Sequence, residues 1–428
     1  MTDDVEPDVL DLPAVGPRDG VGLCLSGGGF RAMLFHLGTL RRLNETGWLA
    51  RLTRVASVSG GSITAAVLGL AWRRLEFDNS GVAGNFGGEV EEPVMDLADH
   101  TLDRPAVLGG LLIPGRISRR VQHAYDRHLF HGATLQDLPH PDEGPLFVIL
   151  STNLSNGSAW RFSQPYMRDW RTDSIANPTL AIAHAVTASS AFPPFLSPSL
   201  LDIPGKGTLQ LTDGGVFDNL GLEPVVKRCA TVFVSDGGGT FKVDPNPKRD
   251  WIRATLRVLD TVDVEVRRLR RRQIVGLLAS RQRRGAFMAI NTDYSRFPQR
   301  SPALPAGDAA TKALSRIPTR LKEIDPTVRR QLVNWGYAAC DAALRSYLDK
   351  ELFDPPGFSV PDGGRGLTAN ERPASRWRRL PAAAATAVDC CRGETTVGRR
   401  PGTLAGACRL RHPRRGHGVR AEHRTEML

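Results

Sequence analysis

The sequence predicts an α/β protein built around a mostly parallel β-sheet. Residues 21–25 and 230–236 are predominantly apolar runs of the kind that form parallel strands buried on both faces. The runs 21–25 and 54–58 are each followed by apolar residues at helical spacing, so each begins a strand-to-helix unit. With 428 residues, 41% of them hydrophobic, the chain can fill one large α/β core and carry additional segments.

Three consecutive glycines join the first strand to its helix. Gly27, Gly28 and Gly29 lie between the strand at 21–25 and a helix expected over 32–40. Without Cβ atoms, their N–H groups can converge near the positive end of the helix and form an anion site. A dinucleotide-binding turn is the alternative, but it calls for an acidic residue near the end of the second strand, and residues 53–57 contain none.

Ser59 occupies the second strand-to-helix turn. Residues 54–58 are small or β-branched apart from Arg54, and the helix expected over 60–68 opens with Gly60 and Gly61. Such a turn exposes a hydroxyl above the sheet edge and tolerates only small neighbours. Ser57 stands where the pattern G-x-S-x-G has its first glycine. The alternative is that these serines are ordinary caps of a helix N-terminus.

Asp213 ends a short strand expected over 209–212 and is followed by Gly214 and Gly215. The two glycines let the chain turn away sharply after the carboxylate. A D-G-G turn at the surface is the alternative interpretation. His36 and His184 lie on apolar helical faces, so both are expected to be packing residues rather than catalytic ones.

Together these motifs resemble those of the patatin-like phospholipase family. The resemblance runs from about residue 21 to residue 236, through L-S-G-G-G-F-R at 25–31, S-V-S-G-G at 57–61 and T-D-G-G at 212–215. The small-residue helix at 181–192, stopped by prolines, is similar to a stretch that the family carries ahead of the aspartate. The family implies a three-layer α/β/α fold with a central, mostly parallel sheet.

The resemblance also implies a chemistry. Ser59 would be the nucleophile and Asp213 its base, although the two lie 154 positions apart in the sequence. Gly27, Gly28 and Gly29 would form the oxyanion hole, and Arg31 would hold a lipid phosphate or steady the loop. An aspartate with a pKa of about 3.9 is too weak a base for this role unless desolvation raises that pKa. The expected reaction is hydrolysis of lipid acyl esters, of phospholipase A or lysophospholipase type, without a metal or organic cofactor.

Two other functions remain open at this stage. The chain could be a catalytically silent lipid-binding or interaction protein of the same fold, because Ser57 and Ala32 depart from the motifs. It could instead be a nucleotide-binding enzyme that uses the glycine loop. A lipid ester is the expected partner, with transient contact to a membrane surface, and no nucleic acid is expected.

The expected organisation has four parts. Residues 1–17 form an acidic tail, residues 18–240 the catalytic domain with a lid or insertion at about 73–144, and residues 241–354 a helical extension with helices at 251–284 and 326–352. Within the insertion, the apolar stretch 105–114 is expected either to rim the active site or to pack in the core. Residues 355–428 are expected to be a disordered, Arg-rich tail.

Charge and cysteine content bear on location and partners. Residues 361–428 hold 14 arginines and six acidic residues, so a net charge of +8 out of the total of +11 lies in the tail. The N-terminus lacks the features of a secretory signal, and no apolar run reaches the roughly 18 residues that a membrane span needs. We therefore expect a cytoplasmic protein, peripheral at a membrane, whose six cysteines are free thiols.

Overall fold

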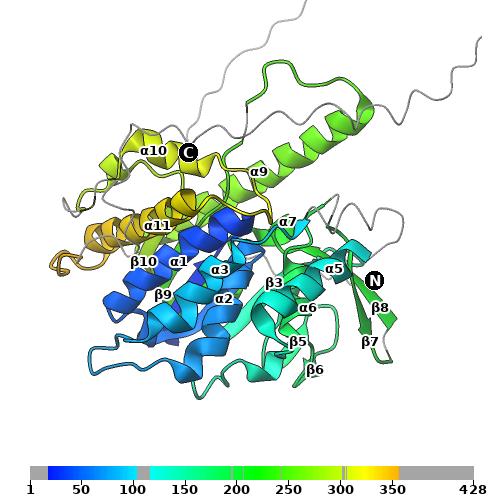
Figure 1. The fold of residues 1–428 in the computed structure, drawn as a ribbon, viewed down its shortest axis with the longest axis horizontal. Helices are drawn as coiled ribbons and strands as arrows, with labels where there is room; N and C mark the ends of the chain where they lie inside the picture. The colour runs from blue at the N-terminus through cyan, green and yellow to red at the C-terminus, as the bar shows by residue number, and fades with distance from the viewer. Residues whose placement is uncertain are drawn as a thin grey trace, which may run out of the picture. The chain divides into compact units, whose positions relative to one another are not determined.

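A ten-stranded mixed sheet organises the chain (Figure 1). The computed structural model describes residues 18–103, 116–193, 196–205, 207–241, 243–300, 304 and 306–355, and the expectations for 1–17, 105–114 and the tail after 355 lie outside these residues. The strands are β1 (Arg18–Leu25), β2 (Leu52–Val58), β3 (Leu146–Asn153), β4 (Ala159–Phe162), β5 (Tyr166–Arg168), β6 (Ile175–Ala176), β7 (Ser199–Ile203), β8 (Gly207–Asp213), β9 (Cys229–Asp236) and β10 (Arg284–Ala289).

Parallel pairing defines the centre of the sheet. The order is β10-β9-β1-β2-β3-β4-β5-β6, and every pair from β10 to β3 is parallel. Strands β4 and β8 both pair with β3 in the antiparallel sense, and β7 pairs with β8. The carboxyl ends of β1, β2 and β9 therefore meet at one edge of the sheet, where ligands bind in open α/β folds.

Helices cover both faces of the sheet (Figure 1). They are α1 (Gly29–Glu45), α2 (Gly60–Ala71), α3 (Glu92–Leu97), α5 (Arg116–Tyr125), α6 (Ile182–Ser189), α7 (Gly215–Asp218), α8 (Glu223–Val226), α9 (Trp251–Ala279), α10 (Asp308–Ser315) and α11 (Pro326–Tyr347). The larger apolar core lies under α1, α2, α6 and α11, and a smaller one lies under α8 and the end of α9. Two cores on opposite faces confirm the three-layer α/β/α fold.

Helices α1 and α11 cross with their backbones almost in contact. A Cβ atom built on Gly38 would overlap the carbonyl oxygen of Val333, and one built on Gly336 would overlap the carbonyl oxygen of Phe35. Only glycine permits this approach, because any side chain would force the helices apart.

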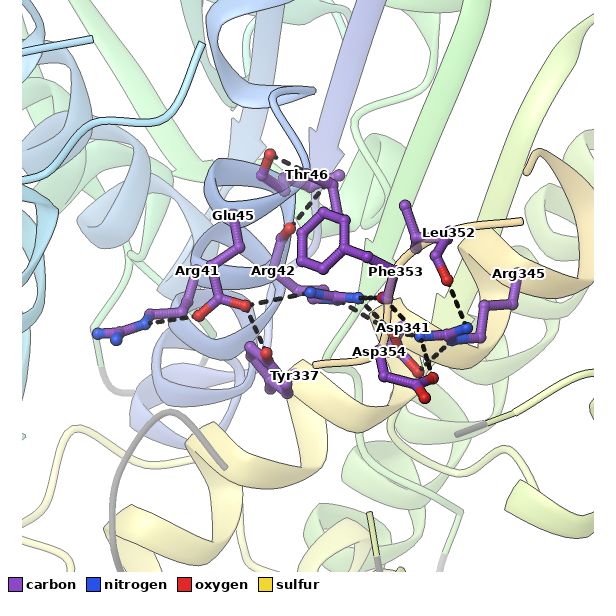
Figure 2. Close-up of polar contacts among 11 residues, drawn as sticks. Arg41, Arg42, Glu45, Thr46, Tyr337, Asp341, Arg345, Leu352, Phe353 and Asp354 are labelled. Carbon is purple, nitrogen blue, oxygen red and sulfur yellow. Dashed lines mark hydrogen bonds and ion pairs between the residues drawn. The ribbon is translucent and has the colours of Figure 1, made fainter. Parts of the chain in front are cut away.

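A buried polar cluster fastens the same two helices (Figure 2). Arg42 of α1 forms an ion pair of 2.8 Å with Asp341 of α11, and both side chains are fully buried. Arg345 bonds to the same carboxylate at 3.1 Å and to the carbonyl oxygen of Phe353 at 2.7 Å. Two cations therefore share one buried anion, and their remaining donors bond to Glu45, to Asp354 and to backbone carbonyls that follow α11.

The extension at 241–354 differs from the expectation that it would be helical. Helix α9 ends at Ala279, and β10 then adds an edge strand to the sheet beside β9. The helix expected over 326–352 is α11 and ends at Tyr347. The apolar alternation of R-G-A-F-M-A is too short to distinguish a strand from the last turns of a helix.

Candidate active site

Ser59 lies at a strained turn between β2 and α2. Its backbone has φ 51° and ψ −119°, a conformation that residues with a side chain rarely adopt. The residue is only 6% exposed. A serine held in this geometry at the start of a helix is the arrangement of a nucleophile elbow, which presents the hydroxyl at the end of the strand.

The glycines after Ser59 allow the turn to contact neighbouring backbone. A Cβ atom on Gly60 would overlap the carbonyl oxygen of Gly29, and one on Gly61 would overlap that of Leu25. The N–H group of Gly61 donates to the carbonyl oxygen of Ser26 at 3.1 Å. The serine turn and the glycine loop are thus packed directly against each other.

Ser57 is accommodated where the usual pattern has glycine. Its side chain is buried, and its hydroxyl accepts a hydrogen bond of 3.1 Å from the hydroxyl of Ser62. Ser62 follows on α2, so this bond ties the last turn of β2 to the first turn of the helix.

The sheet brings Asp213 to Ser59. Val58 pairs with Leu150 of β3, and the next residue of β3, Ser151, pairs with Asp213 at the end of β8. The Ser59 side chain lies close enough to the Asp213 carboxylate to lower the pKa of that carboxyl. One oxygen of that carboxylate also accepts from the N–H group of Gly215 at 2.7 Å.

Burial changes the acidity of Asp213. Desolvation raises the pKa of its carboxyl to about 7, because an ionised carboxylate is disfavoured away from water. The hydrogen bond from Gly215 and the nearby Ser59 side chain oppose this rise, and the charge of Asp263 adds to it. Asp213 is therefore a far stronger base than an exposed aspartate, as the proton transfer from a serine requires.

Gly214 completes the aspartate turn. A Cβ atom there would lie 2.5 Å from the carbonyl oxygen of Leu150. The D-G-G sequence is thus buried between strands and is not a surface turn.

Helix α6 holds the serine and aspartate turns together. The N–H group of Ser59 donates to the hydroxyl of Ser189 at 2.9 Å, and the N–H group of Gly214 donates to the carbonyl oxygen of Ser189 at 3.3 Å. Ser189 also bonds to the hydroxyl of Ser62 at 2.9 Å. Ser189 was not among the predicted site residues, although it lies in the small-residue stretch at 181–192.

The glycine loop begins α1 with two residues at positive φ. Gly28 has φ 150° and Gly29 has φ 61°, so both occupy backbone space that favours glycine. Within the described residues, the N–H groups of Gly28 and Gly29 donate to no acceptor. They are free donors at this helix N-terminus, where a developing negative charge would be stabilised.

Gly27 differs from the expectation that it would donate to an oxyanion. Its N–H group donates to the carbonyl oxygen of Asn219 at 3.1 Å and is therefore already occupied. The side chain of Asn219 packs so closely that a Cβ on Gly27 would overlap it. Asn219 thus positions the loop against the turn that follows Asp213, a role that its sequence context did not reveal.

The backbone of Arg320 covers the outer side of the loop. Its carbonyl oxygen accepts from the N–H group of Phe30 at 3.0 Å, and it would lie 2.6 Å from a Cβ on Gly29. The segment before α11 is thereby fastened to the start of α1.

Arg31 is buried and fully engaged by the protein. It donates to the carbonyl oxygens of Gly237, at 3.1 Å, and Ile317, and to the hydroxyl of Thr319 at 3.0 Å. Burial is the main cause that lowers its pKa to about 10. Of the two roles expected for Arg31, these contacts favour steadying the loop over binding a phosphate.

The two histidines do not contact the dyad. Nε2 of His36 bonds to the carbonyl oxygen of Ser26 at 2.8 Å and must carry the proton, so Nδ1 accepts from the hydroxyl of Ser235 at 2.7 Å. Burial lowers the pKa of His36 to about 4 and keeps the ring neutral. Burial lowers the pKa of His184, and the nearby backbone of Leu200 opposes this shift.

A pocket of about 510 Å³ lies apart from this site, between α2 and the segment that follows α5. It is lined by Val67, Leu70, Arg73, Arg74, Glu89, Pro93, Leu129, Phe130, His131, Ala133 and Asp137. The residues that the structure describes include no cluster of three or more side chains suited to a metal ion. None of their helices has the length and apolar character needed to cross a bilayer.

Comparisons with known proteins give two similar solved structures and one family match. VipD from Legionella pneumophila is 16% identical, with a TM-score of 0.35, over 77% of this chain and 67% of that chain. Human GIVD cytosolic phospholipase A2 is 12% identical, with a TM-score of 0.44, over 80% of this chain and 62% of that chain. No curated protein sequence matches significantly. Residues 23–226 match the family model described as patatin-like phospholipase, which confirms the resemblance and identifies this segment as a patatin-like phospholipase domain.

Proposed function

We propose that this protein hydrolyses acyl esters of lipids through a Ser59–Asp213 dyad. The observation that carries the proposal is the approach of the Ser59 side chain, at a strained turn, to a buried carboxylate whose pKa is raised to about 7. A hydroxyl becomes an effective nucleophile when a neighbouring base takes its proton as it attacks. The patatin-like phospholipase match over residues 23–226 supports a lipid ester as the substrate.

In the first half-reaction, Ser59 Oγ attacks the ester carbonyl carbon while its proton passes to Asp213. The carbonyl oxygen becomes negative, and the free N–H groups of Gly28 and Gly29 donate to it. Loss of one such donor costs about 100- to 1,000-fold in rate. The tetrahedral intermediate then breaks its bond to the leaving alcohol, which takes the proton from Asp213 and leaves an acyl group on Ser59.

In the second half-reaction, Asp213 takes a proton from water as the water attacks the acyl carbonyl. The same amides hold the second oxyanion. Collapse of this intermediate releases the fatty acid and returns the proton to Ser59, so the dyad is restored without a net change in charge.

The test compares wild type, Ser59→Ala and Asp213→Asn on a panel of phospholipids, lysophospholipids and neutral glycerides. Loss of either group should lower kcat by roughly 1,000-fold or more, as for other nucleophile and base deletions. Ser155→Ala, at an exposed serine in the loop after β3, is the matched control and should retain full activity. Equal turnover by all variants would contradict the mechanism, and no turnover by the folded wild type would favour a silent lipid-binding protein.

A further inference from the structure

One side of α9 exposes a continuous row of large apolar side chains. We call this row the α9 apolar face. Its members are each between 52% and 78% exposed, and they are Trp251, Ile252, Val258, Leu259, Val262 and Leu269. The surface of a soluble protein rarely exposes so many large apolar side chains together, and such patches mark contact sites.

The spacing places these residues on one side of the helix. Trp251, Val258, Val262 and Leu269 follow one another at intervals of seven, four and seven residues, which keeps them within a narrow arc of an α-helix. The other end of α9 is anchored, because Ile274 and Leu277 pack in the smaller core beneath the sheet. In Figure 1 helix α9 extends beyond the sheet.

The helix is also strongly basic. Residues 248–272 contain nine arginines or lysines and four acidic residues, a net charge of +5. An amphipathic helix with an apolar face and an excess of arginine is suited to the interface of an anionic bilayer, where each basic residue contributes about 1 kcal/mol near the surface.

The middle of α9 lies beside the candidate active site. The Arg270 guanidinium stacks over the ring of Phe217, four residues after Asp213, with 5.8 Å to the ring centroid. Arg267 donates to the carbonyl oxygen of Gly239 at 3.1 Å, just beyond the carboxyl end of β9. A surface that contacts α9 would therefore meet the protein close to Ser59.

We propose that the α9 apolar face docks the protein on an anionic lipid surface. The inference rests on the proposed function, since a lipid hydrolase must reach esters held in an aggregate. Charge favours an anionic lipid over two other occupants of this face, a second copy of the chain and the segment 361–428. A second copy would place one helix of net charge +5 against another, and residues 361–428 carry a net charge of +8. The basic helix would therefore repel both of these occupants, whereas it would attract an anionic lipid surface.

Binding is measured by co-sedimentation of the full-length protein with vesicles of ether-linked, non-hydrolysable phosphatidylglycerol and phosphatidylcholine. Val262→Glu should lower the partition coefficient about tenfold, because it removes an apolar contact and adds a repelled charge. Val275→Glu is the matched control, since Val275 lies on α9, is 46% exposed and is rotated about 240° from Leu269, off the face. The control should bind like the wild type, and all three proteins should bind pure phosphatidylcholine weakly.

A second assay separates this proposal from the proposed function. Val262→Glu should hydrolyse a soluble short-chain ester at the wild-type rate but lose activity on anionic vesicles of ester-linked lipid. Vesicle binding without any hydrolysis would uphold docking and overturn the hydrolase assignment. Hydrolysis with equal vesicle binding by wild type and Val262→Glu would overturn docking alone.

Other occupants of the face would give distinct results. A wild-type dimer that Val262→Glu dissociates, with vesicle binding unchanged, would assign the face to a second copy and overturn the proposal. A monomer that binds no vesicles and whose α9 amides are protected from hydrogen exchange would assign it to another segment of the chain, with the same consequence.

Discussion

The backbone of Ser59 is held in place by its neighbours and not by its own preference. A non-glycine residue in such a region costs about 1–3 kcal/mol, which the surrounding structure must offset. Here the hydroxyl of Ser189 satisfies the Ser59 N–H group, and the glycines of the two loops permit the close approach that fixes the turn. The proposed nucleophile is thus oriented before any substrate arrives.

Ser189 should accordingly act as a positioning residue. Ser189→Ala leaves the buried N–H group of Ser59 without an acceptor, so the turn relaxes and kcat on a soluble ester should fall about tenfold with little change in KM. Ser190→Ala is the matched control, because the Ser190 hydroxyl bonds to the carbonyl oxygen of Val186 and not to Ser59. If both variants lost stability alike and neither lost kcat, Ser189 would have only a structural role.

The raised pKa of Asp213 predicts the pH dependence of activity. The carboxylate must be ionised to accept a proton, so kcat/KM on a soluble ester should fall about tenfold per pH unit below pH 7. A profile that stayed flat down to about pH 4, the range of an ordinary aspartate, would show that Asp213 is not the base.

The same group links stability to pH. The pKa of Asp213 is higher in the folded state than in the unfolded chain. The contribution of this group to the free energy of unfolding is therefore present at low pH and is lost as the pH rises to about 7. The side chain of Asp213→Asn cannot ionise. The melting temperature of this variant relative to that of the wild type should therefore increase as the pH rises across this range.

Sequence motifs identify candidate reactive side chains more easily than they identify the side chains that position them. The pairing of Ser59 with Asp213 was implied by the resemblance to a family, through motifs in which two glycines follow each residue. Asn219 contributes a backbone carbonyl and Ser189 a single hydroxyl, and neither contribution leaves a distinctive pattern. The Gly27 amide could not be excluded as an oxyanion donor from sequence, because its acceptor lies 192 positions away.

At the scale of elements, the contact between α1 and α11 fixes the glycine loop. Helix α1 begins at that loop, and α11 packs across it through the glycine crossing and the Arg42–Asp341 pair. These partners are 299 positions apart, so helical periodicity predicts each helix but not their pairing. The glycine loop of the candidate active site therefore depends on a helix far outside the matched domain.

Two glycine substitutions test this dependence. Gly336→Ala should destabilise the protein by several kcal/mol, since its Cβ would overlap the Phe35 carbonyl oxygen and push α11 from α1. Gly276→Ala, in α9 with open space around it, should stabilise the protein by about 0.5–1 kcal/mol. Urea denaturation measures both, and equal effects would contradict the close-packed crossing.

At the scale of the whole molecule, the fold class and the central strands could be predicted from the sequence. Apolar runs with glycine turns define β1, β2, β8 and β9, because buried parallel strands and sharp turns each have a strong composition. Strand β10 was not predicted. Its short alternation of apolar residues follows a long helix, and its pairing with β9 is determined by tertiary structure. The extension thus completes the sheet of the catalytic fold.

The most direct test of the central claim is labelling by an alkyl fluorophosphonate, followed by peptide mass spectrometry. The folded protein should carry one adduct on Ser59, the labelling rate should fall below about pH 7, and Asp213→Asn should react far more slowly. An adduct on another serine, or native protein that stays unlabelled, would contradict the account.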